Sequence, residues 1–133
     1  MSAVETTAYA ITRTVDAPFD ATVERVTAAL AAEGFGVLTT IDVSATLRAK
    51  LGSDLPPYVI LGACNPVLAE QGLGLEPDLG VLLPCNVVVR ATAEGTHVAA
   101  MEPLAAMALA GNEALGDLAG EARARIERAV RSL

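Results

Sequence analysis

The chain has 133 residues, a length typical of one domain, and 53% of its residues are hydrophobic whereas 19% are charged. This composition excludes disorder, because the apolar surface is ample to offset the conformational entropy lost on folding. The formal net charge of −7 leaves no basis for binding nucleic acid, which requires clustered Lys and Arg.

The first residues carry neither a basic leader nor an apolar signal core, and no apolar run approaches the roughly 18 residues that a membrane span needs. We therefore expect a cytoplasmic protein with no membrane partner, built as a single domain over residues 1–133. In that reducing compartment, the two cysteines are expected to be thiols rather than a permanent disulfide.

The first half of the chain alternates between strand and helix patterns. The β-branched content of residues 4–16 predicts one long strand. From Phe19 to Leu30 the apolar residues recur at steps of four, three and four, which predicts an amphipathic helix that ends at Gly34. The same signals predict two further strands, over 35–41 and 58–63. They also predict two short helices, over 44–51 and 66–71.

Residues 81–90 are apolar on both parities, which predicts a strand covered on both faces. Pro84 cannot donate a backbone hydrogen bond, so it predicts a bulge or an edge just before Cys85. A turn is expected at Glu94-Gly95, followed by an antiparallel strand over 96–101.

Counting back from a two-residue turn at Glu94-Gly95 places Arg90 opposite Ala99. On that parity the thiol of Cys85 points towards the core, whereas Asn86 points to the other face together with Met101.

The chain from Pro103 onwards is expected to be helical. Asn112 can cap the last helix, on which one apolar stripe contains Leu115, Leu118, Ala119, Ala122, Ile126, Val130 and Leu133. Gly116 and Gly120 form a small notch that can admit another backbone. Together the elements predict a two-layer α+β fold, with a mostly antiparallel sheet of about five strands and the long C-terminal helix packed on it.

Two Cys-Asn pairs, Cys64-Asn65 and Cys85-Asn86, contain every cysteine of the chain. Each thiol lies in or beside an apolar run, and each is followed by a side-chain amide that both donates and accepts hydrogen bonds. These four residues are the candidate ligand-binding residues, and the two thiols are the candidate metal ligands.

Four segments occur in order along the chain: GFGVLT at 34–39, PYVILGACNP at 57–66, EPDLG at 76–80 and LLPCNV at 82–87. With these segments the chain closely resembles the domain-of-unknown-function family 302, over nearly its whole length. The resemblance implies a small α+β domain with the β-α-β(4)-α layout of the TATA-binding-protein-like fold, and a tendency to form homodimers. It implies no reaction, because family members share no agreed activity and a fold by itself assigns no function.

The two thiols differ in their expected surroundings. Cys85 is typical of a small buried hydrophobe. Cys64 ends a strand and abuts a helix start, where peptide N–H groups and the helix dipole favour a thiolate, although a cysteine packed under that helix is an equal alternative. The thiols become neighbours only if the end of the third strand lies beside Pro84, which the sequence permits and does not require.

A structural zinc site is disfavoured, because two cysteines 21 positions apart and one histidine, His97, supply too few ligands. A two-coordinate soft ion such as Cu(I), or a four-thiolate site shared across a dimer, stays open. His97 beside a turn is more typical of an exposed residue than of a ligand. The sequence names no cofactor.

Four further residues are secondary candidates: Glu76, Asp78, Met101 and Glu102. The carboxylates of Glu76, Asp78 and Glu102 can crowd one end of the sheet. Paired carboxylates do acid and base chemistry when their pKa values are pushed apart. Glu76-Pro77-Asp78 is more typical of a turn. Met101 is more typical of a core residue than of a sulfur ligand.

Three hypotheses for function follow. The leading hypothesis is a homodimeric binding or sensing module in which both Cys-Asn pairs line a small pocket for a soft metal ion, a sulfur species or an oxidant. The second is an enzyme that uses Cys64 as nucleophile or redox centre, with a base that the sequence does not name. The third is a structural or interaction domain whose cysteines only pack.

Overall fold

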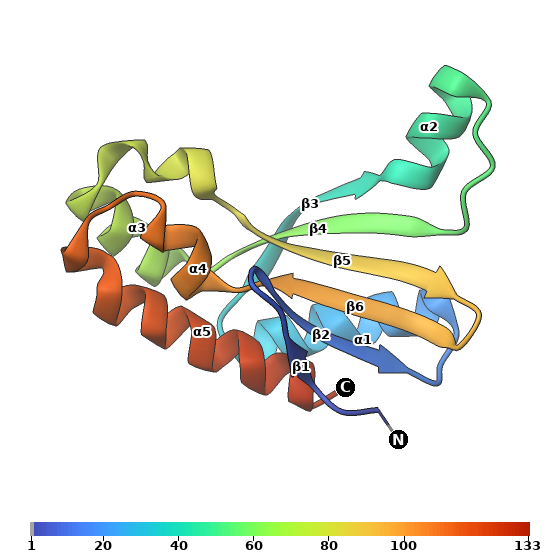
Figure 1. Cartoon of the computed structure of the whole chain (residues 1–133), viewed down its shortest axis with the longest axis horizontal. Helices are drawn as coiled ribbons and strands as arrows, with labels where there is room; N and C mark the ends of the chain where they lie inside the picture. Colours follow the sequence, from blue (N-terminus) through green and yellow to red (C-terminus); the bar gives the residue numbers. More distant parts are fainter. Residues whose placement is uncertain (1) are drawn as a thin grey trace.

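The computed structural model describes residues 2–133 and is built around one six-stranded sheet (Figure 1). The strands lie in the order β1-β2-β6-β5-β4-β3, and every neighbouring pair is antiparallel. Their bounds are β1 Glu5–Thr6, β2 Ala10–Val15, β3 Gly36–Asp42, β4 Tyr58–Cys64, β5 Cys85–Thr92 and β6 Gly95–Met101.

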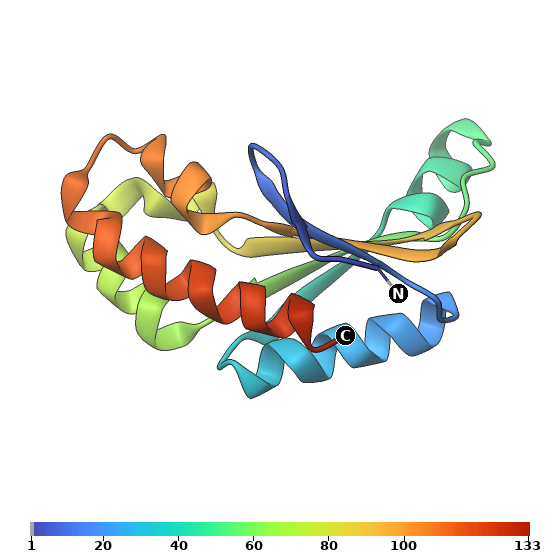
Figure 2. The ribbon, with the colours of Figure 1, turned by 60° about the horizontal axis from the view of Figure 1, so that its bottom comes forward.

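Five α-helices accompany the sheet in the described part of the chain. They are α1 Phe19–Ala32, α2 Val43–Leu51, α3 Pro66–Leu75, α4 Pro103–Ala108 and α5 Gly116–Arg131, with 3-10 helices η1 Pro77–Leu82 and η2 Glu113–Leu115. Helices α1 and α5 lie along the same face of the sheet, α3, η1 and α4 gather at one end, and α2 projects at the other (Figures 1 and 2). None of the helices over residues 2–133 is both long and apolar enough to cross a membrane.

The predicted α+β fold is confirmed. The succession β2-α1-β3-β4-β5-β6-α5 has the β-α-β(4)-α layout. Helices α2 and α3 are insertions between its strands, and α4 is an insertion between β6 and α5. The C-terminal helix packs on the sheet as expected, through the apolar stripe that ends in Ile126 and Val130. Asn112 caps the preceding 3-10 turn, since its Oδ1 accepts a hydrogen bond from the backbone N–H of Ala114 at 3.0 Å.

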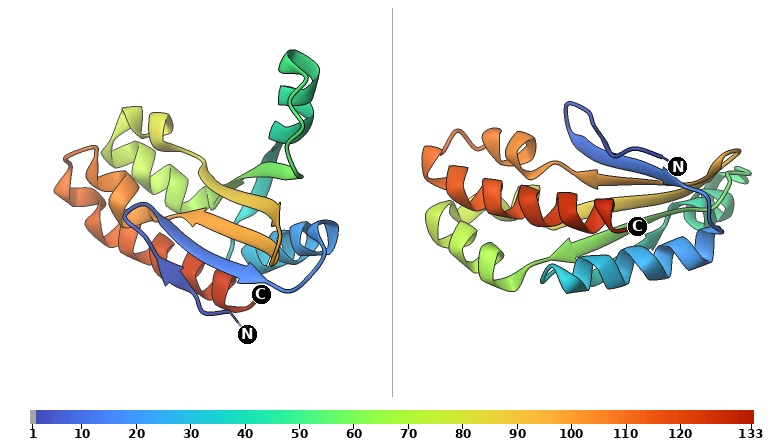
Figure 3. Two further views of the ribbon diagram at one scale, coloured as in Figure 1. Left: turned by 45° about the vertical axis from the view of Figure 1, so that its right-hand side comes forward. Right: turned by 90° about the horizontal axis from the view of Figure 1, so that it is seen from below.

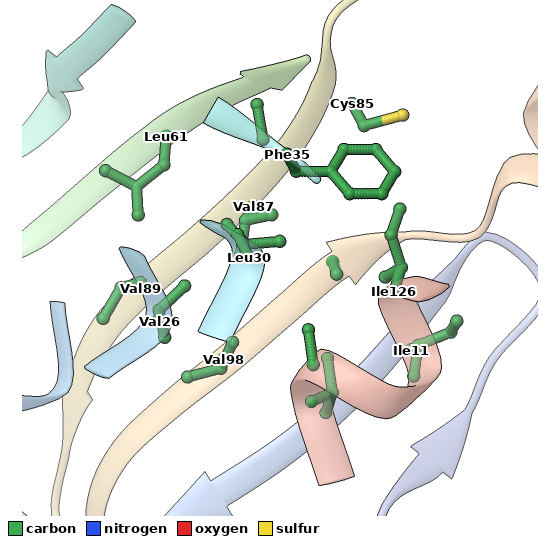
Figure 4. Close-up of a cluster of buried hydrophobic side chains, with 14 of the residues drawn as sticks. Ile11, Val26, Leu30, Phe35, Leu61, Cys85, Val87, Val89, Val98 and Ile126 are labelled. Carbon is green, nitrogen blue, oxygen red and sulfur yellow. The ribbon is translucent and has the colours of Figure 1, made fainter. Parts of the chain in front are cut away.

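The core lies between the sheet and helices α1 and α5 (Figure 4). Alternate residues of β5, Val87 and Val89, are 1% and 0% exposed and meet Val26 and Leu30 of α1. Full burial of such a side chain stabilises the fold by about 1.5–3 kcal/mol. The burial alternates because only one face of β5 is covered by helices.

The prediction of a strand over 81–90, covered on both faces, is therefore wrong. The strand begins at Cys85, because Pro84 cannot contribute to a ladder, and the apolar residues before it form η1. The buried Leu79 of η1 packs into a second, smaller core with Met107 and Leu118.

Residues 4–16 do not form a single strand either. The chain turns at Thr7. The Thr7 hydroxyl accepts a hydrogen bond from the Ala10 N–H at 3.0 Å, and the backbone N–H of Thr7 donates to the Ala10 carbonyl at 2.8 Å. β1 thus folds back on β2, which adds a sixth strand to the five expected. Propensity alone does not locate such a turn, because the β-branched residues continue through it.

The β5–β6 register is shifted by two residues from the prediction. Arg90 lies opposite His97 and not Ala99, because Thr92 pairs with Gly95 and the two-residue loop is Ala93-Glu94. A shift of two preserves parity, so the expected inward direction of Cys85 is confirmed. The helix predicted over 66–71 also runs on to Leu75.

Replacing Gly95 by Ala is expected to destabilise the fold. Gly95 has a φ of 128°, and an added Cβ would collide with the backbone carbonyl of Val15. We expect a loss of about 2–4 kcal/mol in the free energy of unfolding, measured by urea denaturation.

The matched control is Gly120→Ala in α5, where an added Cβ meets nothing within 4 Å. This change is expected to raise stability by up to about 1 kcal/mol, as Gly-to-Ala changes do in open helix positions. A Gly95→Ala protein as stable as its parent would contradict the geometry of this turn.

Candidate functional site

The sheet brings the two cysteines together at one end of the molecule. Cys64 is the last residue of β4 and Cys85 is the first of β5, and the two strands are neighbours. Ala63 is the register partner of Cys85, so Cys64 lies one position diagonally beyond it. Both cysteines, which are free thiols, line the same cavity.

This thiol cavity lies where β4 and β5 meet α3, η1 and α5. Its walls contain the two cysteines and Asn65, together with Phe35, Ala63, Leu68, Ala69, Leu79, Leu83, Pro84, Met107, Leu118 and Ala122. No lining side chain is charged. The cavity volume is about 20 Å³. On the same scale one water molecule needs roughly 10–15 Å³, so the cavity admits a single ion or a species of one or two heavy atoms.

Asn65 fixes the turn from β4 into α3. Its side-chain Oδ1 accepts a hydrogen bond from Leu68 N–H at 3.2 Å, which makes it the N-cap of a helix with Pro66 in its first turn. Asn65 is 7% exposed and its side chain packs against Gly34. An added Cβ at Gly34 would lie 2.9 Å from Asn65 Nδ2, and Gly34 has a φ of 84°, so glycine is required there.

Gly36 lies beside Cys64 in the sheet. The two residues are register partners in the β3–β4 ladder and therefore share one face of the sheet. An added Cβ at Gly36 would meet nothing within 4 Å, so open space adjoins Cys64. Cys64 is partly exposed, whereas Cys85 is only 5% exposed.

The electrostatics of the cavity favour a neutral thiol at Cys85. Burial, and to a lesser degree the charge of Cys64, raises the pKa of the Cys85 thiol to about 11 from its ordinary 9.0. Cys85 is therefore protonated near neutral pH. A metal ion that binds the Cys85 thiolate must displace the thiol proton.

The remaining candidate residues lie outside the thiol cavity. Asn86 is exposed on the other face of β5, as its parity predicts. Met101 is partly buried and packs against the main hydrophobic core. Glu102 is 5% exposed, but its Oε1 pairs with Arg123 Nε at 2.7 Å and its Oε2 caps α4. Glu102 is thus held by structural contacts.

Glu76 and Asp78 flank the start of η1 rather than a cleft. Glu76 Oε1 accepts a hydrogen bond from Asn112 Nδ2 at 3.3 Å, and Asp78 is exposed. His97 lies on the uncovered face of the sheet, with its Nδ1 2.8 Å from Thr14 Oγ1. Over residues 2–133, no three His, Cys, Asp or Glu side chains gather in an arrangement that could hold a metal ion.

Sequence reasoning does not pick out Gly34 and Gly36 as residues of the site. The available signal is the Gly-Phe-Gly spacing, in which the two glycines flank a buried aromatic that itself lines the cavity. Met107 and Leu118 are missed as well, because they come from helices far along the chain.

The fold and the site together define a small α+β domain with a pair of thiols at one end of an antiparallel sheet. The chain belongs to the family described as domain of unknown function DUF302, whose model matches residues 11–133.

A solved structure agrees with this family assignment. A crystal structure of an uncharacterized conserved DUF302 protein from Bacillus stearothermophilus is 31% identical to this chain, with a TM-score of 0.84. The match covers 90% of this chain and 94% of that one. The comparison with curated proteins found no match.

The raised pKa of Cys85 predicts how stability depends on pH. Above about pH 9 the unfolded chain releases the thiol proton that the folded protein retains up to about pH 11. The contribution of the neutral Cys85 thiol to the free energy of unfolding is therefore complete below pH 9, and it is lost as the pH rises towards 11. We expect the free energy of unfolding to fall by roughly 2–3 kcal/mol more across this window than in a Cys85→Ala protein.

The measurement is urea denaturation of both proteins between pH 8 and pH 11 under a reductant. The comparison cancels the titration of all other groups. Parallel pH profiles for the two proteins would contradict the assignment of a buried, neutral thiol.

Filling the space beside Cys64 is expected to protect its thiol. A Gly36→Val side chain would stand next to Cys64 on the same face, and we expect its reaction with an aromatic disulfide reagent to slow by roughly tenfold or more. The control is Thr40→Val, an exposed position in the same strand. Equal labelling rates in the two variants would show that Cys64 is reached from elsewhere.

Proposed function

We propose that this chain is a binding or sensing module whose two thiols take a soft metal ion, a sulfur species or an oxidant. One observation carries the proposal: Cys64, Cys85 and the buried Asn65 line the same small cavity, whose walls carry no charge. We further propose that it works as a homodimer in a reducing compartment, where both cysteines remain thiols.

The chemistry of the walls selects the ligand. Hard divalent cations require several oxygen ligands, and the cavity offers no carboxylate. Thiolates prefer soft ions, and Cu(I) accepts two of them with no further ligand. A single ion also suits a volume of about 20 Å³. Because Cys85 must lose its proton, the affinity is expected to rise with pH.

Binding is favoured over catalysis at this site. A nucleophilic cysteine needs a base within hydrogen-bond reach, and no histidine or carboxylate lines the cavity. His97 pairs with Arg90, roughly 17 Å along β5 from Cys85 at about 3.4 Å per residue. At that separation its side chain does not reach the cavity.

Anaerobic titration with Cu(I) against a chromophoric chelator tests the proposal. We expect one ion per chain, with the dissociation constant raised by roughly 100-fold or more in Cys64→Ala and in Cys85→Ala, because each change removes one of two ligands. Asn86→Ala is the matched control, since Asn86 lies on the opposite face, and it should bind like the parent. Equal affinity in a protein lacking both cysteines would refute the thiol site.

A further inference from the structure

A third sulfur-bearing side chain lines the thiol cavity. Besides Cys64 and Cys85, the walls contain Met107, which belongs to α4 and is 5% exposed. The strand register explains how this distant residue arrives there. Val87 pairs with Ala100, so the start of β5 lies beside the residues that lead from β6 into α4. In both views of Figure 3, α4 (orange) lies against α5 (red) at this end of the sheet.

The thiol cavity lies at the boundary between the two hydrophobic cores. Cys85 and Phe35 belong to the main core, whereas Met107 and Leu118 belong to the smaller one. Leu68 lines the cavity and packs against both cores. Cys85 and Met107 therefore line the same space from two different cores, and the cavity is the volume that neither core fills.

Met107 also borders a second, larger hollow. This groove has a volume of about 410 Å³ and lies between α4 and the start of α5, where its walls include the exposed residues Leu104, Gly111 and Glu113. The Met107 side chain thus has the thiol cavity on one side and the groove on the other. An unbranched thioether adapts its conformation readily, so space on two sides lets the sulfur atom adjust to an ion in the cavity.

A thioether suits the charge balance of this cavity. Thiolate and thioether sulfur are the ligands that soft ions such as Cu(I) prefer. A Cu(I) ion held by two thiolates already carries one excess negative charge, and a third thiolate would bury another among uncharged walls. The sulfur of methionine adds a donor atom without adding charge. Structural zinc requires four ligands, one more than the three sulfur-bearing side chains supply.

We propose that Met107 is the third ligand of the soft-ion site, together with Cys64 and Cys85, and that it makes the site favour Cu(I) over Zn(II). The inference rests on the thiol site proposed above and completes its coordination. Binding forms three sulfur–copper bonds and transfers no electron. Each thiol releases its proton to solvent as it becomes a thiolate.

Metal titrations of a Met107→Leu protein test the selectivity. The change conserves side-chain volume, so the surrounding cores stay filled, but it removes the donor atom. We expect the dissociation constant for Cu(I) to rise by about tenfold, because one of three ligands is lost, while the weaker binding of Zn(II) stays the same. The matched control is Met101→Leu, since Met101 lines neither the thiol cavity nor the groove, and it should bind Cu(I) like the parent.

Selenomethionine-labelled protein tests the bond itself. X-ray absorption at the selenium edge of the Cu(I)-loaded protein should show a copper neighbour in the parent and in Met101→Leu. The same measurement on Met107→Leu should show none. A weaker affinity in Met107→Leu without a copper neighbour in the parent would mean that Met107 acts only through packing, and would overturn the proposal.

The remaining outcomes separate this ligand from the thiol site. If Met107→Leu binds Cu(I) as tightly as the parent while Cys64→Ala and Cys85→Ala lose the ion, the third ligand is overturned and the two-thiol site stands. A parent protein that binds no Cu(I) would overturn both.

Discussion

The pairing of β4 with β5 is the contact on which the rest of the structure depends. Its register places Leu61 opposite Val87 and Val59 opposite Val89, and all four side chains are buried against the helices. A slip of one residue would turn each of these side chains to the uncovered face, so the core itself enforces the register. The same register brings the end of β4, with Cys64, next to the start of β5, with Cys85, which means that the placement of both cysteines is inherited from hydrophobic packing.

Local signals in the sequence predicted the local features of this arrangement. Alternating hydrophobicity predicted the inward direction of Cys85, and the Asn-Pro pair predicted the cap of α3, because both effects operate within a few residues. The β5–β6 turn was predicted one residue too late, at Glu94-Gly95 and not Ala93-Glu94, and the register was therefore two residues off. Alternating hydrophobicity does not detect this error, since a shift of two leaves every side chain on the same face. That both cysteines line one cavity was beyond prediction, because it depends on elements far apart in the chain, such as η1 and the helices with Met107 and Leu118 on which Leu79 packs.

Identical dipeptides acquire different roles from their positions in the fold. Cys64-Asn65 stands at the end of a strand, where the chain turns into a helix and the amide can reach back to a backbone N–H. Cys85-Asn86 stands at the start of a strand, where successive side chains point to opposite faces. A repeated motif therefore does not form a symmetric site here; one asparagine shapes the cavity and the other faces outward.

The space beside the thiols distinguishes a binding site from simple packing. Protein interiors are filled to the density of organic crystals, and an unfilled volume costs stability. Cysteines that served only as small hydrophobes would be expected in such a filled interior. Here the walls next to them are built from Ala63, Ala69 and Ala122, where a larger aliphatic side chain would close the cavity. An uncharged cavity that both cysteines line is the feature that favours an occupant over packing alone.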